Sequence, residues 1–384
     1  MRFIHTADWH LGRYFHGLHL TDDQRDLLLG QFLPLVRDEK ADAVVIAGDI
    51  YDRGIPPVEA VALFDEVLTK LIEQKVRVLY IAGNHDSARR IHFGSRLMRE
   101  AGVFVRGELE DPLEPVCLED AAGPVYFQLY PYEEPAAVRS AFGVEGIMDF
   151  DSASRLMIDA GRKRIPDGSR AIAVAHAFLA GGQSSESERP LSVGGSGSVS
   201  PSMFRPFHYT ALGHLHNPQA AGSETIRYSG SLMKYSFDEA SQQKGVNVID
   251  LDGQGQVTRR FQTLIPRHDV CRVRGLFADI LADTESYPPN DAFMEVVLKD
   301  QRPVLDAFNR LKERYPNLMH IMRADTVSRD LSWEQHGQAI LKQSETDLFE
   351  QYYEAMKGSC MTDEQQLILR DCMKEVMKEA REQG

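Results

Sequence analysis

Side chains that bind metal ions follow five apolar segments of this chain, each at the point where a buried strand is expected to end. Because the carboxyl ends of parallel strands meet at one edge of a sheet, these side chains can converge within a few ångströms. The spacings Asp-x-His and His-x-His place both side chains on the same side of an extended backbone. The candidate groups are Asp8, His10, Asp49, Asn84, His85, His176, His214 and His216.

All of these groups except His85 suit two divalent metal ions. Imidazole, carboxylate and amide oxygen together fit Mn²⁺, Fe²⁺ or Zn²⁺, with Mg²⁺ as a further alternative. Asp49 is alone on its turn, and its two oxygens can bridge both ions. The four positive charges of the two ions exceed the two negative charges of the aspartates. The remaining positive charge favours binding of a negatively charged phosphate ester and of its more highly charged transition state. Two such ions can activate a water and clamp the phosphoryl group, and His85 would protonate the leaving oxygen.

Alternating strands and helices must position these residues. Short apolar runs at 2–6, 43–47 and 76–82 predict strands, and helical spacing of apolar residues predicts helices at 22–39 and 56–72. This alternation over about 100 residues predicts a mainly parallel sheet with helices on both faces. A further helix is expected to begin at Ser87 and to run through Met98, and strands are expected at 116–118, 125–129, 170–175 and 207–212.

The pattern changes twice towards the end of the chain. Residues 181–200 are rich in glycine and serine and predict a long loop, either a functional lid or disordered. We expect three parts: a domain at 1–266 that carries the candidate residues, a small α+β unit at 267–327, and C-terminal helices at 333–384.

Composition narrows the class of protein. The 384 residues carry a net charge of −14, which argues against coating nucleic acid by bulk positive charge. This charge does not exclude a nucleic-acid enzyme, because bound metal ions can supply local positive charge. No run of about 20 apolar residues predicts a membrane span, and Met1 leads directly into a strand without a signal-peptide pattern. The four scattered cysteines form no C-x-x-C pair, so we expect a cytoplasmic protein. No P-loop is present, hence no ATP site of its own is expected.

The strand-end motifs resemble those of the calcineurin-like metallophosphoesterases, and all are present in the family's order. They are Asp8-Trp9-His10, Gly48-Asp49-Ile50-Tyr51-Asp52-Arg53-Gly54, Gly83-Asn84-His85-Asp86, His176 and Gly213-His214-Leu215-His216. The resemblance implies an α/β fold, a four-layer metallophosphoesterase β-sandwich flanked by helices, with a small α+β capping domain and C-terminal helices. It also implies His85 as the catalytic histidine. It assigns one metal to Asp8, His10, Asp49 and His216, and the other to Asp49, Asn84, His176 and His214.

Three longer stretches, at 5–12, 187–195 and 228–236, resemble the double-strand-break-repair nucleases within this family. That likeness implies a Mn²⁺-dependent exo- and endonuclease that acts on DNA double-strand ends and hairpins. It implies that the unit at 267–327 helps DNA bind, and that two copies pair through helices near 58–74 and 88–101. It also implies that the C-terminal helices dock on the coiled coil of an ATPase partner.

Two residues and two alternative functions stay open. Archaeal and eukaryotic relatives carry a histidine at position 52, whereas Asp52 matches the phosphatase branch, in which this aspartate pairs with the catalytic histidine; we therefore hypothesise that Asp52 orients His85. Asp86 could cap a helix or support a metal ligand. The alternatives are a phosphodiesterase or phosphatase of the same superfamily with a non-DNA substrate, and a non-catalytic scaffold whose metals serve structure.

Overall fold

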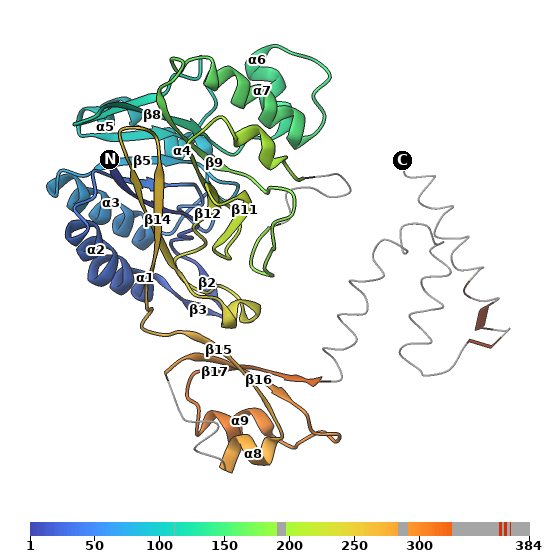
Figure 1. Ribbon diagram of the computed structural model, residues 1–384. Helices are drawn as coiled ribbons and strands as arrows, with labels where there is room; N and C mark the ends of the chain where they lie inside the picture. The colour runs from blue at the N-terminus through green and yellow to red at the C-terminus, as the bar shows by residue number, and fades with distance from the viewer. Residues whose placement is uncertain are drawn as a thin grey trace. The chain divides into compact units, whose positions relative to one another are not determined.

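A computed structural model (Figure 1) describes most of the chain in two compact units. The described residues are 1–110, 112–189, 197–282 and 291–324, with the single positions 361, 362, 365, 366 and 369. The first unit comprises Met1–Val273, Thr284–Glu295 and Phe308–His320, and the second comprises Arg274–Asp283, Val296–Ala307 and Ile321–Gly384. The helices expected at 333–384 lie outside the described residues, apart from those five positions, and stay a prediction.

The first six-stranded sheet has the order β14-β13-β1-β4-β5-β6. Its four parallel strands are β1 (Arg2–Thr6), β4 (Ala43–Ile46), β5 (Arg77–Ile81) and β6 (Val103–Arg106), and β13 (Gly245–Leu251) and β14 (Val257–Thr263) run antiparallel. The strands predicted at 2–6, 43–47 and 76–82 are confirmed. Thr6 pairs with Ile46 and Ile46 with Tyr80, so three strands end level with one another.

The second six-stranded sheet has the order β11-β12-β10-β9-β8-β7. Its parallel strands are β8 (Gly123–Tyr130), β9 (Arg170–His176), β10 (Tyr209–Gly213) and β12 (Ile226–Tyr228), and β7 (Val116–Asp120) and β11 (Gln219–Ser223) are antiparallel. Gly213 pairs with His176, so the segments that follow β9 and β10 leave the sheet together. This register delivers the three downstream histidines to one edge.

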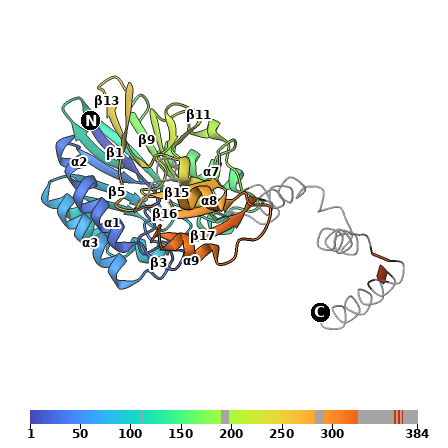
Figure 2. The same cartoon turned by 90° about the horizontal axis from the view of Figure 1, so that it is seen from below.

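The two sheets pack face to face, which gives the four layers that the family resemblance implies. Phe3 of the first sheet contacts Phe127 and Tyr209 of the second, with ring centroids 5.5 and 5.9 Å apart. In Figure 2, helices α1 (Thr21–Leu27), α2 (Leu33–Asp38) and α3 (Val58–Glu73) lie outside the first sheet, and α7 (Phe150–Arg162) lies outside the second. The expectation of helices on both faces of one sheet is therefore wrong. Strands such as β4 are apolar on both faces, and that pattern shows burial without showing whether a helix or a sheet covers each face.

Two of the expected helices depart from regular α-helix. The helix at 22–39 is continuous, but its middle, η1 (Leu28–Phe32), has π-helical hydrogen bonding between α1 and α2. The helix expected from Ser87 through Met98 is broken into α4 (Ala88–His92) and α5 (Ser95–Glu100). Phe93 leaves the helical conformation after α4, and Gly94 follows with a φ of 75°, a left-handed conformation directly before α5.

Shorter elements complete the described chain. They are the hairpin β2 (Tyr14–Phe15) and β3 (Leu18–His19), helix α6 (Pro135–Phe142), and the 3₁₀ turns η2 (Pro201–Phe204) and η3 (Phe237–Ser241). The later residues form β15 (Val270–Gly275), α8 (Phe277–Ala282), β16 (Phe293–Leu298), α9 (Ala307–Lys312) and β17 (Leu318–Arg323), with a three-stranded sheet in the order β15-β16-β17. No helix within the described ranges is long and apolar enough to cross a membrane. The boundaries expected at 266 and 327 stay a prediction.

Candidate dinuclear metal centre

The candidate side chains converge where strands of both sheets end, all within the first unit. Ligand-type atoms of Asp8, His10 and His216 lie within 4.8 Å of one another, and so do those of Asp8, Asp49 and His176. The carbonyl oxygen of the Asn84 side chain lies 2.9 Å from His176 Nε2 and 3.1 Å from His214 Nδ1. The structure thus brings together all seven residues that we expect to be ligands.

The turns that carry these residues adopt an unusual backbone conformation. Asp8, His10 and Asp49 have φ values of 52°, 45° and 50°, in the left-handed region that non-glycine residues rarely occupy. Such conformations cost about 1–3 kcal/mol each and cluster at functional sites. Backbone hydrogen bonds hold them: Asp8 N–H donates to the Gly48 carbonyl at 3.1 Å, and His10 N–H donates to the Asp49 carbonyl at 3.0 Å. The side chains converge through these turns, and the extended backbone that we expected for Asp-x-His is wrong.

Gly83 permits the closest approach between two of these turns. A Cβ at this position would lie 2.2 Å from Oδ1 of Asp49, closer than real atoms come. That same oxygen accepts the His85 N–H at 2.8 Å, which fixes the carboxylate. The glycine before Asn84 is therefore required by the contact between the loops that follow β4 and β5.

One half of the site fits a metal ion through His10 and His216. Their Nε2 atoms face each other at 3.0 Å, and burial and then neighbouring charges lower the pKa of His10, so two neutral rings meet. Ligand atoms on one ion at about 2.1 Å are about 3 Å apart, which matches this spacing. His10 Nδ1 is buried without a hydrogen-bond partner. Burial, and then the charge of Asp49, raise the pKa of Asp8, and a cation would relieve this concentration of negative charge.

The other half contains Asn84, His176 and His214. His176 Nδ1 lies 2.8 Å from the Ala47 carbonyl and donates to it, which leaves the Nε2 lone pair towards the site. Oδ2 of Asp49 lies 3.5 Å from His176 Nε2 and 3.7 Å from His10 Nε2. Asp49 therefore stands between the two halves, as a bridging carboxylate must.

His85 lies beside this cluster and has a different set of contacts. Its ring is 4.6 Å from that of His10, and its Nδ1 lies 2.9 Å from the backbone carbonyl of Asp52. The carboxylate of Asp52 instead accepts from Arg13 at 2.9 Å. Burial lowers the pKa of His85, and the charge of Asp49 opposes this. The hydrogen bond between Asp52 and His85 runs through the main chain, while a carboxylate oxygen of Asp52 lies within 4.8 Å of ring nitrogens of His85 and His10. That the carboxylate orients the ring stays a prediction.

Of the two roles left open for Asp86, the contacts fit support of the loops that carry metal ligands and do not fit a helix cap. Its carboxylate accepts the N–H groups of Ile50 and Tyr51 at 3.1 and 2.9 Å, and that of Gly83 at 3.0 Å. Burial raises its pKa to about 7, while these three hydrogen bonds favour the ionised form. Asp86 thus fastens the loop that carries Asp49 to the loop that carries Asn84.

Comparison with known proteins decides the family. Residues 1–147 match the family model described as calcineurin-like phosphoesterase. Residues 266–357 match the SbcD C-terminal model, described as Type 5 capsule protein repressor C-terminal domain. The chain is 32% identical over 357 residues to the SbcD subunit of the nuclease SbcCD from Staphylococcus epidermidis, covering 93% of each protein. It is 30% identical over 380 residues to the protein of the same name from Staphylococcus saprophyticus, covering 99% of each.

The chain belongs to the SbcD family. It is accordingly a hydrolase of phosphodiester bonds on a calcineurin-like metallophosphoesterase fold, as the motifs led us to expect. A solved archaeal phosphodiesterase matches 68% of this chain and 100% of its own, at 10% identity and a TM-score of 0.31, too weak a likeness to add to this.

Four residues around His216 were missed by sequence reasoning. Ser187 and Glu188 come from the loop at 181–200, and Glu239 and Lys244 come from the segment that precedes β13. In the sequence, only the SbcD-like stretches at 187–195 and 228–236 indicated that residues near His216 matter. These stretches do not include Glu239 or Lys244. The described part of the loop is packed against the site through Ser187, so it is no open lid there.

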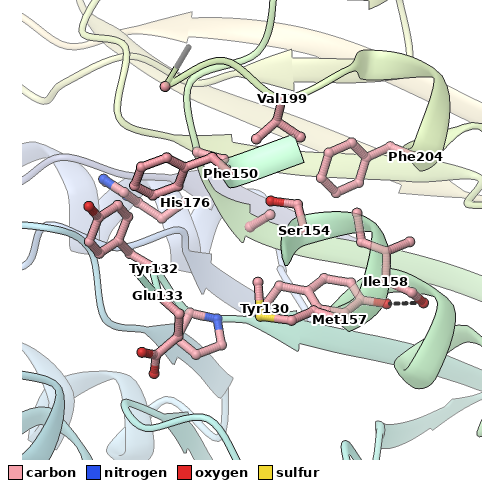
Figure 3. Close-up of a pocket in the computed structure, with 14 residues that line it drawn as sticks. Tyr130, Tyr132, Glu133, Phe150, Ser154, Met157, Ile158, His176, Val199 and Phe204 are labelled. Atoms are coloured by element: carbon pink, nitrogen blue, oxygen red, sulfur yellow. Dashed lines mark hydrogen bonds between the residues drawn. The ribbon is translucent and has the colours of Figure 1, made fainter. Parts of the chain in front are cut away.

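A small apolar hollow borders the site on the side of His176 (Figure 3). Tyr132 and Phe150 line it beside His176, with Met157 and Phe204 further along. Its free volume of about 20 Å³ has room for about one water. This hollow is too small for a nucleotide base.

The ligand histidines are expected to remain neutral in mildly acidic solution. Burial lowers the pKa of His176 to about 4, and burial likewise lowers the pKa of His214 well below the ordinary 6.5. Because a pKa of about 4 lies well below 5.5, the imidazole signals of His176 should not titrate between pH 8 and pH 5.5 in metal-free protein. NMR of ¹⁵N-histidine-labelled protein, assigned by substitution, would measure this, and a midpoint near 6.5 for His176 would contradict it.

Proposed function

We propose that this chain is the metal-dependent DNA nuclease subunit of an SbcCD-type complex, cutting double-strand ends as an exonuclease and hairpins as an endonuclease. The observation that carries this proposal is the convergence of six further ligand-type side chains around Asp49, with His85 beside them. Relatives that match over nearly their whole length are named as the SbcD subunit of the nuclease SbcCD, which favours a nuclease over a phosphatase or small-molecule phosphodiesterase.

Two divalent ions, with Mn²⁺ our first choice, would be held by the side chains already described. Asp8, His10 and His216 would hold one, Asn84, His176 and His214 the other, and Asp49 both. When bound, such ions supply a water of lowered pKa and a positive clamp for the phosphoryl group. The histidine rings are neutral donors and the two aspartates supply the negative charge, a set that suits Mn²⁺ without thiolates.

His85 would deliver the proton to the leaving oxygen. Its Nδ1–H donates to the Asp52 carbonyl, so the ring is fixed and Nε2 is the nitrogen left for proton transfer. Its main-chain N–H donates to Oδ1 of Asp49, which ties the backbone of His85 to that carboxylate. The charge of an incoming phosphodiester would favour the protonated ring and oppose the effect of burial on its pKa.

Comparison of two substrates tests this function. Purified protein with Mn²⁺ is given end-labelled duplex DNA or a chromogenic phosphodiester. The proposal expects cleavage of the duplex, and cleavage of the chromogenic ester alone would leave the phosphodiesterase alternative in its place. A non-catalytic scaffold would cleave neither.

Arg189 is expected to hold the substrate phosphate at the rim of the site. Burial is the main cause of the shifted pKa values of Asp49 and His85, but the charge of Arg189 also acts on both. Loss of a charge-assisted hydrogen bond costs about 1.5–3 kcal/mol, so Arg189→Ala should lower kcat/KM for duplex DNA by about tenfold or more, with unchanged metal content. The control is Arg155→Ala, which removes an arginine paired with Asp151. Equal kcat/KM in Arg189→Ala and wild type would contradict this role.

We further propose that two copies pair through the helices near 58–74 and 88–101. Val58, Phe93 and Leu97 are 79%, 82% and 82% exposed there, which is a high exposure for large apolar side chains. Phe93→Glu should convert a dimer to a monomer in light scattering, whereas Met148→Glu, at a similarly exposed position, should not. A wild-type protein that is monomeric at micromolar concentration would contradict this.

The remaining proposals concern partners. The residues at 333–384 would bind the coiled coil of an SbcC-like ATPase, and the unit at 267–327 would help to hold DNA. Chromosomal DNA and such a partner would place the protein in the cytoplasm. Co-purification of the ATPase with the full chain, and its loss when 333–384 is deleted, tests the first of these.

A further inference from the structure

A buried chain of hydrogen bonds runs from His216 into the protein, away from the proposed metal. His216 Nδ1 lies 2.6 Å from the hydroxyl oxygen of Ser187, and that hydroxyl also contacts Oε1 of Glu239. Oε2 of Glu239 lies 2.6 Å from the ammonium group of Lys244. All four side chains are buried, with at most 9% of each residue exposed. Nothing in the proposed reaction uses Ser187, Glu239 or Lys244.

The proton positions in this chain follow from its charged end. Beside Lys244, Glu239 is a carboxylate, which can only accept hydrogen bonds. Ser187 has one hydroxyl proton and must donate it to Glu239, so its oxygen is left to accept from His216. The proton of His216 is then on Nδ1, and the lone pair is on Nε2, which faces His10 Nε2 at 3.0 Å.

The main chain of His216 is held by the same group of residues. Its N–H donates to Oε1 of Glu188 at 2.6 Å, and its carbonyl accepts from Lys244 at 2.7 Å. Both oxygens of Glu239 have partners, since Oε2 also accepts Tyr235 N–H at 3.3 Å and Oε1 lies 2.9 Å from the Ser236 hydroxyl oxygen, whose single proton also faces the closer carboxylate of Asp238. A buried network with every member paired holds one arrangement rigidly.

We propose that Ser187, Glu239 and Lys244 are positioning residues that fix the tautomer and orientation of His216, so that the Ser187-Glu188 segment must be docked for the metal site to reach full affinity. The inference rests on the proposed metal centre. It gives the SbcD-like stretches at 187–195 and 228–236 a shared physical role, because both contribute contacts to Glu239. By linkage, metal binding and docking of Ser187 stabilise each other.

The effect on metal affinity should differ between two serines that contact the same oxygen. Loss of a hydrogen-bond partner behind a metal ligand costs about 10–100-fold in metal affinity, so Ser187→Ala should weaken Mn²⁺ binding by that factor. Glu239→Gln should weaken it at least as much, because an amide no longer compels Ser187 to donate away from His216. Ser236→Ala is the control, since Ser236 contacts Oε1 of Glu239 and the carboxylate of Asp238 but does not contact His216.

Calorimetric Mn²⁺ titration of the full-length variants measures these affinities, and ¹⁵N NMR of the metal-free proteins reports the His216 tautomer. We expect Nδ1–H in wild type and Ser236→Ala, and loss of that preference in Glu239→Gln. The proposal is overturned if Ser187→Ala and Ser236→Ala lower affinity and melting temperature equally, or if Ser187→Ala and Glu239→Gln bind like wild type. His10→Ala distinguishes failure of the positioning proposal from failure of the proposed metal centre. If His10→Ala also binds Mn²⁺ like wild type, the metal centre itself is misplaced.

Discussion

Replacing His85 by alanine should lower kcat for duplex DNA by about 10²–10⁴-fold, the usual contribution of a positioned general acid. His85 is 5% exposed beside Asp49 and His10, but its Nδ1 is committed to the Asp52 carbonyl. Because it is not one of the seven proposed ligands, the variant should keep two metal ions per chain. Single-turnover cleavage of end-labelled duplex, together with elemental analysis of metal content, measures both quantities.

Asp52→Ala is the informative companion to this variant. The atom of Asp52 that contacts His85 is a main-chain carbonyl, which alanine retains, so Asp52→Ala should cost much less activity than His85→Ala. Its carboxylate instead binds Arg13, and that ion pair would be lost. Equal losses in the two variants would show that the carboxylate matters to His85. A His85→Ala protein with wild-type kcat would remove His85 from the reaction.

Asp49→Asn should have an effect of comparable size through the metals. One amide oxygen cannot bridge as two carboxylate oxygens do, so we expect at most one ion to remain per chain. Loss of several kcal/mol of transition-state stabilisation corresponds to a fall in kcat/KM on the order of 10³-fold. Metal content and cleavage rate of the same sample measure this, with Asp250→Asn as a control, because Asp250 pairs with Arg2 at the start of β1, whereas Asp8 follows the other end of that strand.

Although Asp49→Asn should lower activity, it should raise the stability of the metal-free protein. Burial raises the pKa of Asp49 to about 6, so its ionised form opposes folding above pH 6, and that penalty is relieved as pH falls through 6. The neutral amide removes the penalty, and the melting temperature of metal-free protein at pH 8 should rise. A variant that keeps both metals would contradict the bridging role, and one that melts lower than wild type without metal would contradict the burial penalty on the ionised carboxylate.

The sequence was a good guide to which residues meet and a poor guide to how. Strand ends are visible as apolar runs that stop at polar residues, and the register of β1, β4 and β5 then brings Asp8, Asp49 and Asn84 together. The left-handed conformations of Asp8 and His10 were not predictable, because hydrogen bonds between separate turns maintain them. Strands apolar on both faces did not show that a second sheet covers the first.

Residues that act from behind the ligands were hardest to foresee. From the sequence, Asp86 could be taken for a helix cap. The three N–H groups that it actually accepts come from two different loops, and only the fold brings these loops together. Glu239 and Lys244 are charged residues in a short polar segment, where exposure is the usual expectation. Glu239 and Lys244 can be buried because they pair with each other and because Lys244 donates to the His216 carbonyl. The order of residues in the sequence does not show such contacts.

Two metal ions around Asp49 should be needed together for DNA cleavage, and one titration decides this. The cleavage rate of end-labelled duplex DNA is followed as metal-free protein is titrated with Mn²⁺ under tight-binding conditions. We expect little cleavage up to one equivalent per chain, and a rise that reaches its plateau at two equivalents. Full activity at one equivalent, or no cleavage with two ions bound, would contradict the dinuclear mechanism.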